Sequence, residues 1–269
     1  MAGLKKICCV CAAFFSFSIL ATFSTGVGFA AAPDKKAVKE ALKELLKEEP
    51  ELILNLLREN SEIVLEIAQE GSMQRNRKAT VARWKQELNN KVDIDFTDHA
   101  IRGDKNAPVT ITGYTDFLCG YCQQSEFVIE KVLQKYKGKV RFVYKPMPRE
   151  GNELSELSAT YVVAAMMQDE AKGWQYYDLL FKSGAKLTQG GEAFLRASAL
   201  QVGLDPKKLF NDIGSKKVKD FLAKDKAEAE KLDLKGTPYF FVNNIVVRGF
   251  VAQDLFEEAV QMVLDAAKK

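Results

Sequence analysis

The sequence predicts an α/β domain that carries a helical insertion and is preceded by an all-helical N-terminal segment. The composition changes near residue 92, because residues 34–90 contain one proline and one glycine and are dense in Leu, Ile, Val, Glu and Lys. From Ile101 onward, short apolar runs typical of strands alternate with amphipathic helical runs. A long helical block separates the first two predicted strands from the last two. These observations together favour a mixed fold with two parts.

Residues 1–30 have the layout of a secretory signal peptide. Lys5 and Lys6 form its positive region, and the 26 residues that follow them carry no charge. Gly28 and Ala30 are small residues at the spacing that a signal peptidase reads, so we expect cleavage after Ala30. An uncleaved membrane anchor is the alternative, because the uncharged run is long enough to span a bilayer. Either way, the sequence predicts export.

Cysteine usage after export is restricted to one pair. The chain has five cysteines, and Cys8, Cys9 and Cys11 lie in the predicted signal peptide. The mature chain then keeps only Cys119 and Cys122. In an oxidising compartment, a single closely spaced pair favours redox chemistry over a structural disulfide, which would close a very short loop.

Composition argues against several other functions. Without Lys5 and Lys6, the 39 Lys and Arg residues become 37, against 36 Asp and Glu, so no nucleic-acid partner is predicted. Zinc prefers four ligands, and His99, which we expect at the surface, is the chain's only histidine. We therefore expect no metal and no cofactor, although two thiolates alone can hold Cu(I), and this copper-binding alternative stays open.

Residues 34–91 are predicted to be helical and to mediate oligomerisation. The helices are too few and too short to bury their apolar faces within the segment alone, and a helix gains most of its stability by packing such a face. The polar stretch from Ser72 to Arg83 indicates a solvated connecting helix, which favours self-association into a dimer or trimer over folding back. Pro50 suits the first turn of a helix. The residues that set the helical spacing are Val38, Leu42, Leu45, Leu46, Leu52, Ile53, Leu56, Leu57, Ile63, Val64 and Ile67.

The α/β domain is predicted to span residues 100–269 and to begin with a strand, a helix and a second strand. Val109–Phe117 is a largely apolar run that indicates a buried strand. Cys119–Lys137 has the pattern of an amphipathic helix that ends before Gly138. Val140–Lys145 is the second strand, and two prolines close it.

A helical insertion is predicted for about residues 152–233. Asp205 and Pro206 have the residue types of a helix N-cap and first helical position. Four runs in the insertion have helical periodicity: Leu154–Met167, Trp174–Lys182, Ala193–Val202 and Lys216–Leu232. Four aromatic residues are expected in its core and not in a ligand site: Trp174, Tyr176, Tyr177 and Phe181.

The chain is predicted to close with a hairpin and a helix. Gly236–Pro238 precede a strand at Tyr239–Val242. Asn243–Asn244 is a tight-turn signal, and Ile245–Val247 is the partner strand. Gln253–Ala267 has the pattern of a final helix.

The cysteine pair is predicted to lie at the N-terminus of the helix that follows the first strand. A helix N-terminus stabilises a negative charge and therefore favours a thiolate. Cys119 is then the exposed nucleophile, and Cys122, one turn later, resolves the mixed disulfide. This arrangement is typical of thiol-disulfide exchange.

These motifs resemble those of the thioredoxin-like Dsb proteins of bacterial periplasms. The resemblance rests on the run from Ala107 to Ile111, on Asp116-Phe117-Leu118-Cys119-Gly120-Tyr121-Cys122, and on Gly236-Thr237-Pro238 before a Phe-Phe-Val strand. It extends from about Gly103 to the end of the chain. The N-terminal segment, with Glu49-Pro50-Glu51, is similar to the oligomerisation segment of the suppressor-of-copper-sensitivity C proteins.

The resemblance implies a thioredoxin fold and a set of site residues. Pro238 is then a cis proline beside the cysteines, and the backbone of Thr237 binds an extended substrate chain. Gly120 and Tyr121 lie at the substrate side and set the redox poise. Glycine and tyrosine between the cysteines, and a threonine before the proline, resemble the disulfide isomerases of the family more than its strong oxidases. We expect a less extreme oxidant than those oxidases.

One position departs from the family pattern. Many thioredoxin-like proteins carry a buried carboxylate six residues before the first cysteine, and this chain has Gly113 there. Asp116 is not a positional replacement, and we expect it to be a loop or cap residue. Water or Lys145 is the candidate acceptor for the proton of Cys122.

The sequence-based hypothesis is a periplasmic disulfide isomerase or reductase that reshuffles disulfides in misfolded or reduced exported proteins. A membrane redox partner would reset its cysteines. Three alternatives stay open: a monomeric DsbA-like dithiol oxidase, a Cu(I)-binding protein using the same two thiols, and a holdase chaperone that clasps unfolded chains in an oligomer cleft.

Overall fold

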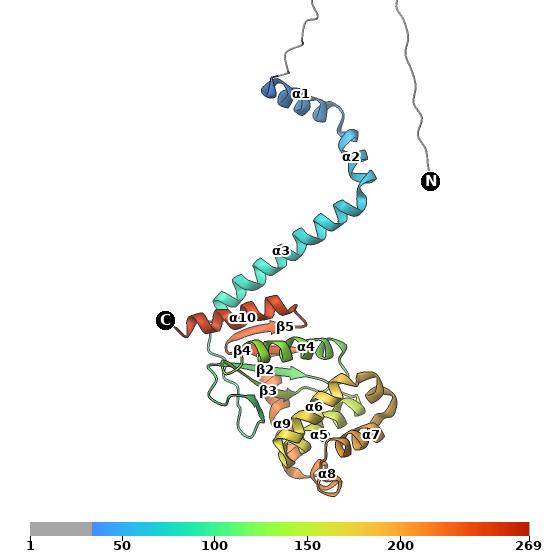
Figure 1. Ribbon diagram of the computed structural model, residues 1–269, viewed down its shortest axis with the longest axis vertical. Coiled ribbons are helices and arrows are strands. Elements are labelled where there is room, and N and C mark those ends of the chain that lie inside the picture. The colour runs from blue at the N-terminus through green and yellow to red at the C-terminus, as the bar shows by residue number, and fades with distance from the viewer. Residues whose placement is uncertain (1–33, 269) are drawn as a thin grey trace, which may run out of the picture. The chain divides into compact units, whose positions relative to one another are not determined.

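The computed structural model describes residues 34–268. The predicted signal peptide and its three cysteines lie outside the described residues. The chain divides into two compact units between Ile67 and Ala68 (Figure 1). In the part of the chain that is described, no helix is both long and apolar enough to cross a membrane.

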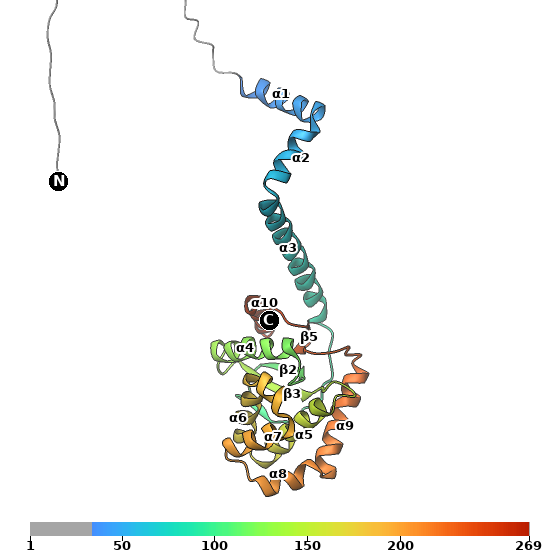
Figure 2. The ribbon, with the colours of Figure 1, turned by 90° about the vertical axis from the view of Figure 1, so that its right-hand side faces the viewer.

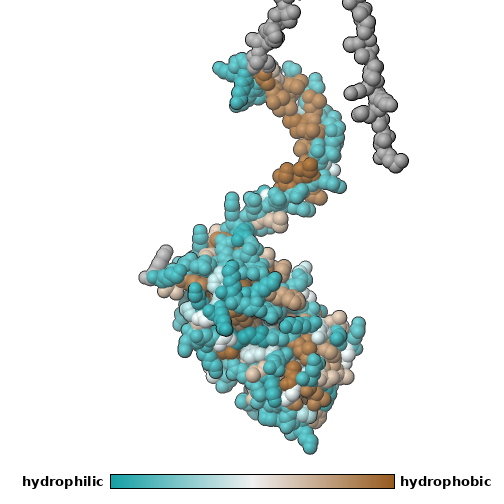
Figure 3. All heavy atoms as spheres, in the orientation of Figure 1, coloured by the Kyte–Doolittle hydropathy of each residue, from teal (hydrophilic) through white to brown (hydrophobic). Residues whose placement is uncertain are grey.

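The first unit consists of helices, as predicted. It holds α1 (Lys35–Glu48), α2 (Pro50–Glu59) and the start of α3 (Ser61–Glu87). Pro50 occupies the first turn of α2, where its missing N–H has no intrahelical partner to lose. No residue of α1 or α2 is buried, and their apolar side chains gather along both helices (Figure 3). The large exposed ones are Val38, Leu42, Leu45, Leu52, Ile53, Leu54, Leu56 and Leu57.

The second unit is built on a five-stranded mixed sheet. The strand order is β1-β3-β2-β4-β5, with β2 and β3 parallel and the other neighbours antiparallel. Every residue of β2 is buried, which explains its largely apolar run. The first strand has only three residues and was not predicted, because a run that short carries no periodicity. The strands are β1 (Ile101–Gly103), β2 (Val109–Thr115), β3 (Val140–Pro146), β4 (Tyr239–Val242) and β5 (Ile245–Arg248).

Helices cover the sheet in two groups. The helix after β2, α4 (Gly120–Lys135), packs against the final helix, α10 (Gln253–Ala266). The insertion between β3 and β4 forms a cluster of its own, away from α10 (Figures 1 and 2). Its last helix returns the chain to the sheet against β3. The insertion contains α5 (Glu153–Gln168), α6 (Glu170–Lys182), α7 (Gly184–Gln201), α8 (Pro206–Ile213) and α9 (Lys216–Lys231).

An aromatic cluster joins the insertion to the sheet. The side chains of Trp174, Tyr176, Tyr177 and Phe181 on α6 are buried, as predicted. The Tyr177 ring packs edge to face on Tyr144 of β3 with centroids 5.1 Å apart.

The predicted N-cap in the insertion is present. Asp205 caps α8 by accepting from the backbone N–H groups of two lysines, as its residue type indicates.

The C-terminal half of α3 is less solvated than predicted. Trp84 is fully buried, and its indole Nε1 donates to the carbonyl oxygen of Val246 at 2.9 Å. Arg77 forms ion pairs with Asp254 and Glu258 of α10. The C-terminal half of α3 therefore packs against the rest of the second unit, to which it belongs.

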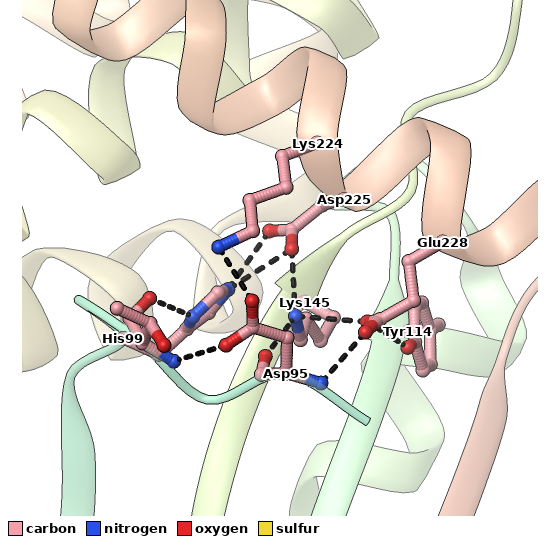
Figure 4. A network of polar contacts seen from close by, with 8 residues as sticks. Asp95, His99, Tyr114, Lys145, Lys224, Asp225 and Glu228 are labelled. Atoms are coloured by element: carbon pink, nitrogen blue, oxygen red, sulfur yellow. Dashed lines mark hydrogen bonds and ion pairs between the residues drawn. The ribbon is translucent and has the colours of Figure 1, made fainter. Parts of the chain in front are cut away.

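A buried ionic network lies between β3, α9 and the segment that leads into β1 (Figure 4). Lys145 Nζ lies 2.7 Å from Asp225 and 2.9 Å from Glu228, and it donates to the carbonyl oxygen of Asp95 at 2.6 Å. The prediction that His99 lies at the surface was wrong, because its side chain is buried and its Nε2 lies 3.0 Å from Asp225. The network thus ties three distant segments together.

We predict that Lys145→Ala lowers the free energy of unfolding by about 3–5 kcal/mol, because it leaves Asp225 and Glu228 without their shared ammonium. Urea unfolding monitored by circular dichroism measures this change. Lys224→Ala is the matched control, since that lysine is half exposed and pairs with Asp95 at the surface, and its loss is expected within about 1 kcal/mol. Equal small losses in both variants would contradict the role given to the buried network.

Candidate active site

The cysteine pair follows the carboxyl end of β2. The loop after the strand turns at Asp116, whose carbonyl oxygen accepts from Cys119 N–H at 3.1 Å. Cys119 then occupies the N-cap of α4, with extended backbone angles, and Gly120 is the first helical residue. Cys122 lies in the first turn. The predicted helix N-terminal placement is confirmed, and both thiols are free.

Cys119 is surrounded by hydrogen-bonding groups. The thiol of Cys122, the Thr237 side chain and the backbone N–H groups of Cys122 and Tyr121 lower the pKa of Cys119 to about 5. Its Sγ lies 3.5 Å from the carbonyl oxygen of Thr237. Cys119 is 9% exposed, which is less than the prediction of an exposed nucleophile implied. At neutral pH this sulfur is a thiolate.

Cys122 is in the opposite state. Its side chain is fully buried, and burial, followed by the hydrogen bond that it gives to Cys119, raises the pKa of the Cys122 thiol above its usual range. Two neighbouring sulfurs thus differ in protonation at neutral pH. One can attack a disulfide, and the other keeps its proton until it is needed.

The loop before β4 completes the site. Thr237–Pro238 is a cis peptide bond, and Pro238 is buried. This loop places Thr237 against Cys119, so the structure brings together two segments more than 100 residues apart. Tyr121 is 62% exposed, and nothing lies within 4 Å of the position that a side chain on Gly120 would occupy. Both residues between the cysteines therefore face open space.

A groove of about 750 Å³ extends from Cys119 and Thr237. The end of β3, the loop after it, α5, α9 and the residues before Gly236 form its walls. Lys226 of α9 and Glu150 of the loop form an ion pair at 3.1 Å at its rim. Sequence reasoning missed this groove, because its walls come from segments without a shared local pattern. Its apolar lining includes Pro146, Met147, Pro148, Leu222, Ala223, Ala229 and Leu234.

Three positions near the cysteine pair bear on which group can accept the proton of Cys122. Gly113 cannot carry a carboxylate, because a Cβ there would lie 2.8 Å from the Phe142 ring and 3.0 Å from the Phe240 ring. Lys145 is a poor candidate acceptor, because its ammonium is held by Asp225, Glu228 and a backbone carbonyl. Glu126, one turn after Cys122, accepts from Tyr177, and burial raises the pKa of Glu126 to about 7.

No metal centre is apparent in the described chain. Among residues 34–268, no group of three or more His, Cys, Asp or Glu side chains could hold a metal ion. His99 has both ring nitrogens engaged, with the Thr97 carbonyl and the Asp225 carboxylate.

Comparison with known sequences shows similarity across the second unit. A family model described as Thioredoxin matches residues 95–265. The Na(+)/H(+) antiporter NhaA 3 of Salinispora tropica is 29% identical over 153 residues, which cover 56% of this chain and 22% of the antiporter. The chain thus spans about a fifth of the length of that relative. The probable disulfide bond formation protein D of Bacillus anthracis is 29% identical over 150 residues, covering 52% of this chain and 68% of that protein.

Solved structures show the same similarity in fold. A thioredoxin-like oxidoreductase from Silicibacter pomeroyi aligns with a TM-score of 0.55 and 26% identity, covering 63% of this chain and 94% of that structure. A linker-deletion mutant of Proteus mirabilis ScsC aligns with a TM-score of 0.56 and 21% identity, covering 88% of this chain and 99% of that structure. The second alignment extends beyond the residues that the family model matches.

We predict that Cys119 alone reacts with iodoacetamide at neutral pH. Because the folded pKa of Cys119 is about 5, the alkylation rate should rise through pH 5 and then level off, whereas an ordinary thiol titrates near pH ~8.5. The same shift stabilises the folded, reduced chain fully above about pH 8.5, and this contribution is lost as the pH falls through about 5. Mass spectrometry of timed samples shows which cysteine carries the label. The variant Cys122→Ser tests how much the second thiol contributes to the lowered pKa of Cys119. A rate midpoint near pH ~8.5 would contradict the thiolate assignment.

Proposed function

We propose, from the premise that this chain belongs to the thioredoxin family, that it is an exported thiol-disulfide oxidoreductase that reduces or reshuffles disulfides in other proteins. The single observation that carries this proposal is the difference between the two sulfurs of Cys119-Gly120-Tyr121-Cys122. A thiolate at the mouth of a groove and a protonated thiol behind it are what the exchange reaction needs.

The reaction begins with the Cys119 thiolate. It attacks one sulfur of a substrate disulfide, so that a mixed disulfide forms and the other substrate sulfur leaves as a thiolate. Cys122 then gives up its proton and attacks Cys119 Sγ, which releases the substrate reduced and leaves the pair as a disulfide. When a second substrate thiolate attacks the mixed disulfide instead, Cys119 is restored and the substrate disulfide has moved. The same site thus supports reduction and isomerisation.

The substrate is an extended protein segment that carries a cysteine. The groove begins at Cys119 and is lined mainly by apolar side chains, so it suits residues that are exposed only in a misfolded chain. The backbone at Thr237 offers hydrogen-bonding groups to such a segment, as in strand addition. The open space at Gly120 and the exposed Tyr121 ring leave room for the approaching chain.

Self-association supports the isomerase role over the oxidase role. The apolar side chains of α1 and α2 are exposed, and large apolar patches of this kind mark interaction sites. We infer that α1 and α2 pair with copies of themselves in a dimer or trimer. Several active sites in one assembly then hold a misfolded protein while its disulfides are exchanged.

The cellular setting follows from the predicted signal peptide and from the chemistry. The enzyme works in the periplasm and is reset by a membrane redox partner, because the isomerase needs its cysteines reduced while its surroundings are oxidising. The similarity to a probable disulfide bond formation protein supports a role in thiol-disulfide chemistry.

Cys119→Ser should abolish insulin reduction and the refolding of a scrambled-disulfide substrate, since the attacking sulfur is gone. Turbidity of the insulin B chain and recovered activity of the refolded substrate measure the two reactions. Cys122→Ser is the informative partner variant, because it should accumulate mixed disulfides that mass spectrometry detects. Retained activity in Cys119→Ser would reject the assignment of the nucleophile.

Leu56→Glu should dissociate the oligomer and reduce isomerase activity at least several-fold while insulin reduction is retained, because it places a charge on the exposed apolar face of α2. Light scattering reports the mass. Glu59→Lys, a charge change at the polar end of the same helix, should leave the mass unchanged. If the wild-type chain is a monomer, and its cysteine pair behaves as a strong oxidant at equilibrium with glutathione, the DsbA-like oxidase is favoured instead.

A further inference from the structure

One wall of the groove beside Cys119 is α9, a helix that buries few apolar side chains. Its sequence, Lys216–Lys231, is largely charged. The buried residues of the helix are Val218, Asp225 and Ala229. A helix is normally fixed on its neighbours by packing an apolar face, so a helix with so little buried apolar surface depends on its polar contacts. The position of this wall therefore depends on what Asp225 binds.

Two faces of α9 have different roles. Leu222, Lys226 and Ala229, about one turn apart, line the groove. Asp225 and Glu228 precede two of these residues by one position and bind the ammonium of the buried network. Successive residues of an α-helix point about 100° apart, so the two sets lie on different faces of one helix. A shift of the carboxylates would therefore move the groove lining with them.

His99 binds the middle of this helix from the segment that joins α3 to β1 (Figure 4). Its side chain is 1% exposed, and its Nε2 lies 3.0 Å from Oδ2 of Asp225. Its Nδ1 lies 2.9 Å from the carbonyl oxygen of Thr97, in its own segment. The imidazole ring packs against Phe221 of α9 with centroids 4.4 Å apart. One side chain thus connects this segment to two successive turns of α9.

The same segment also packs behind the groove through apolar side chains. Val92 and Ile94 are partly buried and pack against a small core cluster. Two members of that cluster, Ala229 and Leu234, also line the groove. Met147 lines the groove as well and packs against the same cluster. Residues 92–99 therefore support the groove without lining it.

We propose that His99 is a positioning residue of the substrate groove, because it fixes the α9 wall through Asp225. Val92 and Ile94 support the same wall from the same segment. The inference rests on the proposed function, since it concerns how the enzyme binds an extended apolar segment of its substrate. A small disulfide needs only the sulfur of Cys119 and not the groove. Loss of the His99 contact therefore weakens the binding of long substrates selectively.

The test compares a substrate that occupies the groove with one that does not. Reduced full-length protein is mixed either with an apolar peptide whose cysteine is joined to glutathione or with glutathione disulfide. Samples are quenched with acid at timed intervals, and mass spectrometry measures oxidation of the cysteine pair. The peptide concentration that gives the half-maximal rate reports binding, and the maximal rate reports the exchange reaction itself.

His99→Phe keeps an aromatic ring against Phe221 but removes the donor to Asp225. It should raise the half-saturating peptide concentration about tenfold, because a hydrogen bond to a buried carboxylate is lost. The maximal rate and the reaction with glutathione disulfide should stay within about twofold of wild type. His99→Gln restores an N–H donor in the place of Nε2 and should return peptide binding to within about threefold of wild type.

Tyr176→Phe is the matched control. It also removes a buried donor, from the carbonyl oxygen of Leu195, but it lies in α6, which lines no part of the groove. Peptide binding by this variant should match wild type. Ile94→Ala should weaken peptide binding in the same selective way as His99→Phe, and it carries the test if His99→Phe does not fold.

Three results would overturn the proposal. The first is wild-type peptide binding in His99→Phe, or in Ile94→Ala where that variant carries the test. The second is an equal loss with the peptide and with glutathione disulfide, which indicates general damage to the fold. The third is an equal loss in Tyr176→Phe, or no recovery in His99→Gln. If the wild-type protein reacts with neither disulfide, the proposed function itself fails, which distinguishes the two failures.

Discussion

The site depends on the hydrogen bond between two sulfurs in unequal surroundings. Cys119 is placed at the N-terminus of α4, where backbone N–H groups and the Thr237 side chain surround it, while Cys122 is one turn deeper and out of contact with solvent. The two states reinforce each other, because the protonated thiol of Cys122 donates to the thiolate of Cys119. The loop before β4 supplies the Thr237 side chain that donates to Cys119, and its residues Gly236 and Thr237 line the groove beside the sulfur. The chemistry is therefore a property of two loops held together by the sheet.

The sheet and the ionic network hold those loops. Lys145 is the last charged residue of β3, and Pro146 beside it already lines the groove. On α9, Asp225 and Glu228 face the network, whereas Leu222, Lys226 and Ala229 face the groove. One helix thus binds the buried lysine on one side and forms a substrate wall on the other. A buried pair of this kind contributes modestly to stability when intact, but it fixes the position of the helix, since a displaced carboxylate would be left unpaired.

The first unit has a different character. Its helices form as their residue pattern predicts, with Asp34 as an N-cap and Pro50 at the first position of α2, yet they bury none of their own side chains. Helix propensity and capping account for local structure, whereas the exposed apolar side chains require a partner. This contrast with the second unit, where α4, α6 and α10 each bury an apolar face, explains why we assign association to the first unit and chemistry to the second.

The sequence by itself determined the order and type of nearly all elements, because helix and strand periodicity, the Asp205-Pro206 cap and the Asn243-Asn244 turn are local signals. It also determined the cysteine pair and its place at a helix N-terminus, since both lie within one short run. Only the tertiary structure decided that His99 and Lys145 share a buried network, that β1 pairs with β3, that a groove opens beside Cys119, and that two aromatic rings leave no room for a side chain at Gly113. These features depend on contacts between segments far apart in the chain, which a local pattern of residues does not encode.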